Sequence, residues 1–253
     1  MQRSQDKPIV AGNWKMNKNA RESIEFFQGF LREITEETEQ SQFILFPQNI
    51  NLLAAKQVLG STKVGWGAQN CYPKESGAFT GETSPQALSE VGAQYCLIGH
   101  SERRTIFQES DEFIADKLVT LQSWGVTPVL CIGETKEQRD QGKTEEVLKN
   151  QLEIGLSKNR IECPLMIAYE PVWAIGTGDV ATPEQAGLAH KFIRSELATK
   201  YTEDYANQTV IMYGGSVKPD SSKALFAQEH VDGFLVGGAS LEVSSFIAIY
   251  KNS

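Results

Sequence analysis

One carboxylate, Glu170, follows a short apolar run at 165–169 that is typical of a buried strand. A loop comes next, with a stiff start at Pro171, an apolar middle and glycines at its end, which favours a mobile lid. Closure would exclude water from the carboxylate and make it a stronger base. The alternative is a structural glutamate in a salt bridge beneath an ordinary packed loop. The predicted lid consists of Pro171, Val172, Trp173, Ala174, Ile175, Gly176, Thr177 and Gly178.

Two glycine-rich turns follow the last two strand-like runs of the chain. Gly214-Gly215-Ser216 comes after the run at 209–213, and Gly237-Gly238 comes after 233–236. Glycines allow backbone N–H groups to approach phosphate oxygens, and a helix N-terminus adds partial positive charge. We therefore predict a phosphate site at these two turns. The alternative is that both are tight turns required by packing.

Asn13, Lys15 and His100 also follow strand-like runs, and no serine or cysteine nucleophile motif and no metal-ligand motif accompanies them. Together with Glu170, this set suits proton abstraction next to a carbonyl, with donors that stabilise the enediolate. His100 precedes a plausible helix start, whose dipole would disfavour a charged imidazole, so we expect a neutral His100 that donates a hydrogen bond. A lone histidine is more often structural, and that is the role expected of the two others, His190 and His230.

The elements that must position these residues alternate between strand-like and helix-like patterns. The eight predicted strands are 8–12, 42–46, 63–68, 94–98, 127–132, 165–169, 209–213 and 233–236. The predicted helices are 20–36, 49–59, one from Ser84-Pro85, 111–124, 137–156, 182–200 and a last one that ends near Tyr250. Consecutive βα units require parallel strands, so we predict one α/β domain over 1–253, a (β/α)8 barrel with all strand C-termini at one mouth. A doubly wound open sheet is the alternative, but its glycine fingerprint is missing at 12–15.

Length, composition and charge restrict the function further. At 253 residues and 28.0 kDa the chain has the size of a single barrel. The net charge of −8 and the lack of a basic run argue against a nucleic-acid partner. The sequence contains no secretory signal and no apolar run long enough to cross a membrane, so we expect a cytoplasmic protein without a membrane partner.

The four cysteines, Cys71, Cys96, Cys131 and Cys163, lack the spacing of a metal or redox motif. Cys96 and Cys131 lie in strand-like runs and are expected to be buried thiols, which fits a reducing compartment. The segment 142–144 resembles the end of a nucleotide-binding loop, but that loop needs glycine where Glu137 stands, so we reject it. We expect neither a metal ion nor another cofactor.

Six segments, in order along the whole chain, resemble the triosephosphate isomerase family. They are Gly12 to Asn17, Gly77 to Glu82, Ile98 to Arg104, Ala168 to Gly178, Tyr213 to Ser216 and Asp232 to Leu241. The resemblance implies a triose phosphate substrate, with dihydroxyacetone phosphate and D-glyceraldehyde 3-phosphate interconverted through an enediol(ate) in glycolysis and gluconeogenesis. It also implies that Glu170 carries the proton and that a neutral His100 polarises and re-protonates the oxygens, a pairing already described for this family. Lys15 would neutralise substrate charge, and Asn13 would orient the oxygens.

The same resemblance implies supporting roles. The backbone of Gly176, Ser216, Gly237 and Gly238 would contact phosphate, Ile175 and Leu235 would clamp the Glu170 side chain, and Glu102 would position Lys15. The family usually has Lys-Thr-Ala at the trailing hinge of the lid, whereas this chain has Asp179-Val180-Ala181, a difference that concerns lid rates.

The loop at 71–83 resembles the arm that joins two subunits of this family, so we expect a homodimer. Thr80, at the tip, would lie near Asn13 and His100 of the neighbouring subunit. Glu82 would meet Arg103, either within its own subunit or close to the interface. The alternative, a free surface loop, fits poorly with Phe79 in the tip.

Two other functions compete with an isomerase. A Schiff-base aldolase on a similar barrel needs a lysine deep in a strand, and the run at 165–169 has none. A barrel kept only for binding would lack Glu170, His100 or Lys15, and all three are present.

Overall fold

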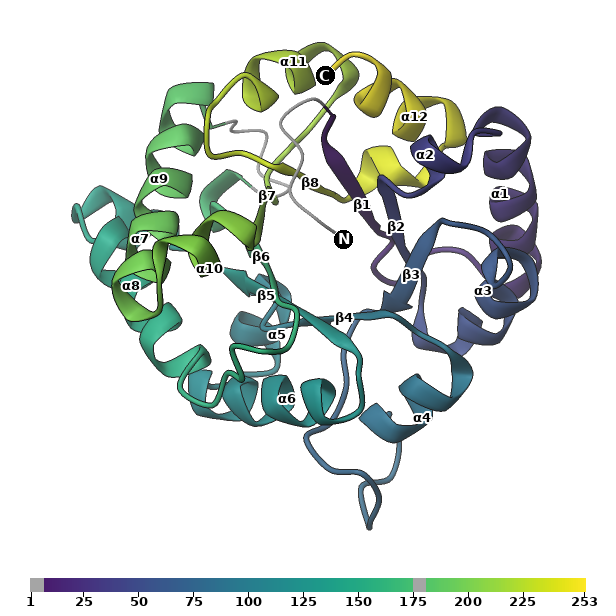
Figure 1. The fold of residues 1–253 in the computed structure, drawn as a ribbon, viewed down its shortest axis with the longest axis horizontal. Helices are drawn as coiled ribbons and strands as arrows, with labels where there is room; N and C mark the ends of the chain where they lie inside the picture. Colours follow the sequence, from purple (N-terminus) through teal and green to yellow (C-terminus); the bar gives the residue numbers. More distant parts are fainter. Residues whose placement is uncertain (1–6, 175–180) are drawn as a thin grey trace.

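A closed barrel of eight parallel strands forms the centre of the protein, whose computed structural model describes residues 7–174 and 181–253. The strands pair in sequence order, and β1 also pairs with β8. They are β1 Ile9–Asn13, β2 Phe43–Phe46, β3 Gly65–Ala68, β4 Tyr95–Ile98, β5 Thr127–Ile132, β6 Met166–Tyr169, β7 Val210–Tyr213 and β8 Gly233–Val236. Helices surround the strands (Figure 1), so the predicted (β/α)8 barrel is confirmed and the open sheet is excluded. β5 and β8 have their predicted bounds, and the other strands differ by one or two residues.

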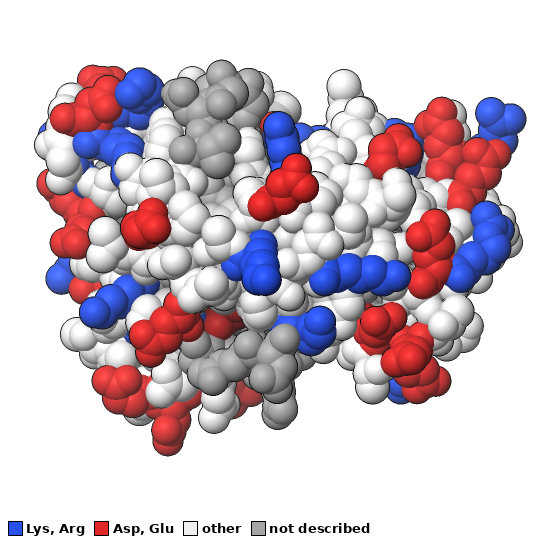
Figure 2. All heavy atoms as spheres, turned by 90° about the horizontal axis from the view of Figure 1, so that it is seen from above, with Lys and Arg blue, Asp and Glu red and all other residues white. Residues whose placement is uncertain are grey.

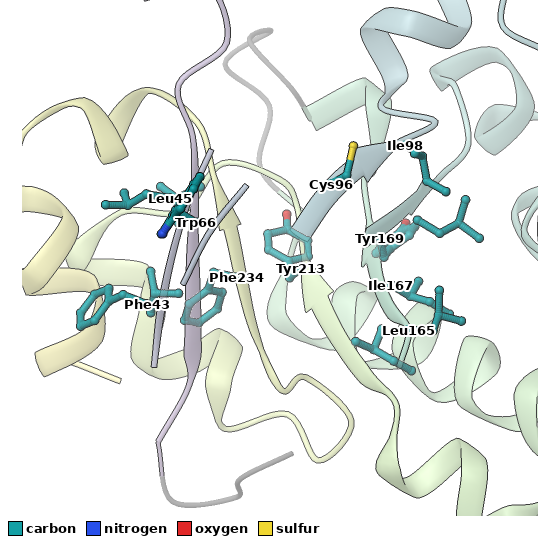
Figure 3. Close-up of a cluster of buried hydrophobic side chains, with 14 of the residues drawn as sticks. Phe43, Leu45, Trp66, Cys96, Ile98, Leu165, Ile167, Tyr169, Tyr213 and Phe234 are labelled. Carbon is teal, nitrogen blue, oxygen red and sulfur yellow. The ribbon is translucent and has the colours of Figure 1, made fainter. Parts of the chain in front are cut away.

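Side chains of every strand except β3 alternate between two cores. Ile9 and Ala11 of β1 belong to a cluster that contains only strand residues and therefore fills the barrel interior. Val10, between them, belongs to the larger cluster between the strands and the helices. Figure 3 shows part of this outer core, including Ile167 of β6 and Phe234 of β8. The strands are thus buried on both faces, which explains why they are short apolar runs in the sequence.

Twelve α-helices lie within the described residues, and several of them begin at a side-chain cap. They are α1 Ala20–Glu33, α2 Glu37–Gln40, α3 Leu52–Leu59, α4 Pro85–Val91, α5 Ser101–Ile106, α6 Asp111–Ser123, α7 Lys136–Asp140, α8 Thr144–Gly155, α9 Pro183–Lys200, α10 Glu203–Gln208, α11 Pro219–Phe226 and α12 Val243–Lys251, with short 3-10 turns η1 Asn49–Asn51, η2 Val172–Ala174 and η3 Gly238–Leu241. The side chains of Ser84 and Thr182 cap α4 and α9, each with proline in the first turn, as predicted.

Three predicted helices differ from the structure by more than one residue. The helix at 20–36 ends at Glu33, because Ile34 leaves helical geometry (φ −114°, ψ 89°) and buries its side chain. The helix at 137–156 is two helices, α7 and α8, because the chain turns at Gly142 with φ of +71°. The helix at 49–59 begins with the 3-10 turn η1. The sequence pattern assigned no helix to α10 or α11, which have only 6 and 8 residues.

The surface carries charges of both signs. On the face in Figure 2, the Lys and Arg side chains of the described residues are interspersed with Asp and Glu rather than gathered into one basic surface. Among the helices that the structure describes, none combines the length and apolar character needed to cross a membrane. The loop between β3 and α4 extends away from the barrel (Figure 1). Cys96 and Cys131 are fully buried, as predicted.

Candidate active site

A cavity of about 380 Å³ opens at the carboxyl ends of the strands. Each wall comes from residues that directly follow or end a strand, because parallel strands of a barrel present all their carboxyl ends on one rim. The structure brings together these predicted residues around the cavity: Asn13, Lys15, His100, Glu170, Gly214, Gly215, Ser216, Leu235, Gly237 and Gly238. A second cavity of about 500 Å³ shares Asn13, Lys15 and His100 and extends toward Glu82 and Phe107.

The Glu170 carboxylate is buried, with only 2% of the residue exposed. Its Oε1 lies 2.9 Å from His100 Nε2, and its Oε2 accepts a hydrogen bond of 2.9 Å from the backbone N–H of Ser101. Burial raises the pKa of Glu170, but His100, the Ser101 N–H and the Lys15 ammonium outweigh it, so the pKa is lowered overall. Glu170 is therefore an ionised carboxylate inside the protein, held by donors at the start of α5.

His100 caps α5 with its imidazole, because Nδ1 accepts a hydrogen bond of 3.2 Å from the backbone N–H of Glu102. Nδ1 must then be unprotonated, so the proton lies on Nε2 and is donated to Glu170. The expected lowering of the His100 pKa is nevertheless wrong for this arrangement. Burial does lower it, but the carboxylates of Glu170 and Glu102 reverse the effect and raise the pKa overall. The helix dipole alone disfavours a charged imidazole, whereas a carboxylate in direct contact favours it.

Lys15 has a left-handed backbone with φ of +51°, a conformation that costs a non-glycine residue about 1–3 kcal/mol. Its N–H donates to Asn13 Oδ1 at 3.0 Å, and its carbonyl oxygen accepts from Gln69 Nε2 at 2.8 Å. Its ammonium lies 2.5 Å from Glu102 Oε1, in the arrangement expected of a positioning carboxylate. Sequence reasoning missed Gln69, although its place directly after β3 was a usable signal.

The two glycine-rich turns leave room beside these groups. A Cβ on Gly214 would lie 2.9 Å from Glu170 Cγ, so only glycine accommodates the carboxylate there. At Gly238 a Cβ would meet no atom of residues 7–174 or 181–253 within 4 Å. Within residues 7–174 and 181–253 the structure gives no hydrogen-bond acceptor for the N–H groups of Ser216, Gly237 and Gly238. These donors are available to an anion in the cavity.

The described part of the predicted lid, Pro171 to Ala174, is held by a buried carboxylate that sequence reasoning missed. Glu134 is fully buried and accepts from Trp173 Nε1 at 2.9 Å and from the Tyr169 hydroxyl at 3.1 Å. Arg139 pairs with the same carboxylate at 3.0 Å and lies over the Trp173 ring. The predictions for Ile175, Gly176, Thr177 and Gly178, and for the hinge residues Asp179 and Val180, lie outside the described residues.

The predicted dimer loop is exposed at Thr80 and Glu82. Phe79 packs on Tyr72 within the loop, with ring centroids 4.2 Å apart. Glu82 and Arg103 both line the second cavity, but the carboxylate 2.8 Å from Arg103 Nε in this chain is Glu109. Within the single chain, Arg103 therefore pairs with Glu109 and not with Glu82.

Comparison with known proteins agrees with this geometry. The sequence model of the family described as triosephosphate isomerase matches residues 8–253. The chain is 49% identical to a triosephosphate isomerase of Bdellovibrio bacteriovorus over 243 residues, which cover 96% of this chain and 98% of the relative. It is 46% identical to those of Fusobacterium nucleatum and Photorhabdus laumondii, over 96% of this chain and 97% and 96% of the relatives. The chain therefore belongs to the triosephosphate isomerase family of enzymes, as its motifs predicted.

Proposed function

We propose that this chain interconverts dihydroxyacetone phosphate and D-glyceraldehyde 3-phosphate through an enediol(ate), as a cytoplasmic enzyme of glycolysis and gluconeogenesis. Residues 1–253 would act as one catalytic domain that needs no cofactor. The observation that carries the proposal is the buried, ionised Glu170 beside His100 and Lys15, in a cavity that also contains backbone N–H groups for which the described residues provide no acceptor. A base, a hydrogen-bond donor, a cation and an anion site are what this reaction requires.

The phosphate of the substrate would bind the N–H groups of Ser216, Gly237 and Gly238, with a further contact from Gly176. This would direct the carbonyl and hydroxyl oxygens toward His100 Nε2, Lys15 Nζ and Asn13. Glu170 would take a proton from the carbon next to the carbonyl, and the electron pair of that C–H bond would form the enediolate. Nε2–H and the Lys15 ammonium would stabilise the oxyanion. Proton return from Glu170 to the neighbouring carbon, with proton transfer between the oxygens at His100, completes the isomerisation.

Glu170 has to release its present partners before it acts as a base. The hydrogen bonds from Ser101 and His100 lower its pKa, and a carboxylate without them is the stronger base. The same departure removes the closest carboxylate from His100 and favours the neutral imidazole that donates to substrate. Closure of the lid, with Ile175 and Leu235 against the Glu170 side chain, would exclude water and prevent loss of phosphate from the enediolate.

Isotope exchange tests the proposed reaction. Incubation with dihydroxyacetone phosphate in D2O should yield glyceraldehyde 3-phosphate with carbon-bound deuterium, because the proton on Glu170 exchanges with solvent. Turnover without any carbon-bound deuterium would contradict proton transfer through an enediolate. Borohydride added during turnover should leave the protein mass unchanged, whereas a stable adduct would indicate a Schiff-base aldolase.

We propose further that two copies form a homodimer through the loop at 71–83. The tip with Thr80 and Glu82 would enter the second cavity of the other copy, near Asn13, His100 and Arg103. Support comes from the side chains at this cavity, since Met16 is 87% and Phe107 62% exposed in the single chain. Sedimentation at micromolar concentration should give the mass of two chains, and a monomeric mass would contradict the assembly.

A further inference from the structure

Arg104, on α5, joins three parts of the rim through one guanidinium group. Its Nε donates to the carbonyl oxygen of Gly99 at 2.7 Å, and its Nη2 donates to that of Cys131 on β5 at 3.0 Å. Its Nη1 lies 2.5 Å from Asp111 Oδ1, at the start of α6, and only 14% of the Arg104 side chain is exposed. Several donors fixed in one plane suit three acceptors in different directions, and an ammonium group cannot reproduce that arrangement.

The backbone at Gly99 is fitted to this guanidinium. Gly99 has φ of +68°, which glycine adopts without strain. A Cβ there would lie 2.9 Å from Arg104 Nη2 and 3.2 Å from the Cys131 carbonyl oxygen. The side chain of Arg104 therefore packs against the turn between β4 and α5 and is hydrogen-bonded to it.

This turn carries both groups that hold Glu170. Its next residues are His100, whose Nε2 lies 2.9 Å from Glu170 Oε1, and Ser101, whose N–H donates to Oε2. The backbone of Glu170 is attached to β5, since its N–H donates to the carbonyl oxygen of Ile132 at 2.7 Å. Arg104 bonds the neighbouring carbonyl of β5, at Cys131, and so connects the turn to the strand that fixes Glu170.

We infer that Arg104 is a positioning residue for the isomerisation proposed above, on which this inference rests. Arg104 lines neither of the two cavities, but its backbone N–H donates to the carbonyl oxygen of His100 at 3.1 Å. It fixes the orientation of the His100 ring and of the Ser101 N–H relative to Glu170. The Nδ1 hydrogen bond that places the imidazole proton on Nε2 depends on that orientation.

Two substitutions at Arg104 and one matched control test the inference. Arg104→Met should lower kcat about 10²-fold with KM little changed, because the geometry of the reacting groups is lost while the phosphate turns remain. Arg104→Lys should recover part of kcat. Arg194→Met is the control: Arg194 also joins backbone carbonyls to a buried carboxylate, Asp232, but at the opposite end of the barrel. It should lower stability and leave kcat unchanged.

Nitrogen-15 NMR of the histidines gives a readout that does not require activity. The chain has three histidines, and substitutions of His190 and His230 assign the remaining signals to His100. In the native protein His100 should show a protonated Nε2 and an unprotonated Nδ1. Arg104→Met should reduce this tautomer, Arg104→Lys should restore only part of it, and Arg194→Met should not change it.

Folded Arg104→Met protein with native kcat and native His100 signals would overturn the inference. If Arg104→Met does not fold, Asp111→Asn weakens the hold on the same guanidinium and should shift kcat and the tautomer in the same direction to a smaller extent. Native values for Asp111→Asn would then contradict the inference. A native protein without isomerase activity would instead contradict the proposed function, while the effect of Arg104 on the His100 tautomer would still be measurable.

Discussion

Each end of the barrel buries a charged side chain, but the two are held in different ways. At the amino end, Arg194 lies 2.6 Å from Asp232 and donates to the carbonyl oxygens of Ala206 and Thr209, while Asp232 also accepts from the Ile211 N–H at 2.8 Å. At the carboxyl end, Glu170 is held by one imidazole and one N–H, beside an open cavity.

The difference shows how similar buried charges serve stability at one end and chemistry at the other. A buried charge enclosed by fixed partners is costly to disturb and keeps one position. A buried charge beside a cavity, with few partners, exchanges them for a substrate. We therefore expect substitutions at the amino end to change mainly stability, and those at the carboxyl end to change mainly kinetics.

The largest expected effect is at Glu170. Glu170→Gln keeps the shape and removes the base, so kcat should fall about 10²- to 10⁴-fold or more. Glu170→Asp withdraws the carboxylate by about 1 Å and should cost on the order of 10²-fold. Steady-state kinetics and thermal unfolding of both variants separate catalysis from folding. Near-native turnover in either variant would contradict a catalytic role for the buried carboxylate at the carboxyl end of the barrel.

Arg194→Met should have the opposite profile. Removing one partner of a buried pair leaves Asp232 without its countercharge, which typically costs about 3–5 kcal/mol of unfolding free energy. Urea unfolding at one protein concentration measures this loss, and the double variant Arg194→Met/Asp232→Leu should lose less. A large fall in kcat of the folded Arg194→Met protein would contradict the expectation that the amino end of the barrel serves mainly stability.

Lys15→Met should give a smaller kinetic effect. The ammonium contributes a charged hydrogen bond to an anionic substrate, worth about 1.5–3 kcal/mol, so kcat/KM should fall roughly 10- to 100-fold. Lys15→Arg is the matched control that keeps the charge. Unchanged kinetics in Lys15→Met would indicate that Lys15 acts only as a surface residue.

The smallest expected effect is the contribution of His190 to the pH dependence of the unfolding free energy. It is fully buried away from the cavity, and burial lowers its pKa from 6.5 to about 3. The pKa of His190 is 6.5 in the unfolded chain and about 3 in the folded protein. The contribution of His190 to the unfolding free energy is therefore complete above pH 6.5 and is lost as the pH falls toward 3. Between about pH 6.5 and 5 the native protein should lose roughly 2 kcal/mol from this residue. Urea unfolding of His190→Gln should show a shallower pH slope, and equal slopes would contradict the assignment.

Much of the fold and of the candidate site follows from the sequence, because each reactive residue stands at the end of a strand or within two residues of it. Glu170 after β6 and His100 after β4 are examples. The contributions of Glu134 and Arg104 do not follow, since a polar residue in a loop or short helix gives no sign that its side chain will bond to the lid or to strand ends. The direction of the His100 pKa shift required the position of the Glu170 carboxylate, 2.9 Å away in space and 70 positions away in the chain.

A crystal structure with a phosphate-bearing inhibitor tests the central claim most directly. We predict that the phosphate binds the N–H groups of Ser216, Gly237 and Gly238, and that the Glu170 carboxylate leaves the Ser101 N–H to face the inhibitor. An anion bound at another place, or Glu170 still hydrogen-bonded to Ser101 beside a bound inhibitor, would contradict the account.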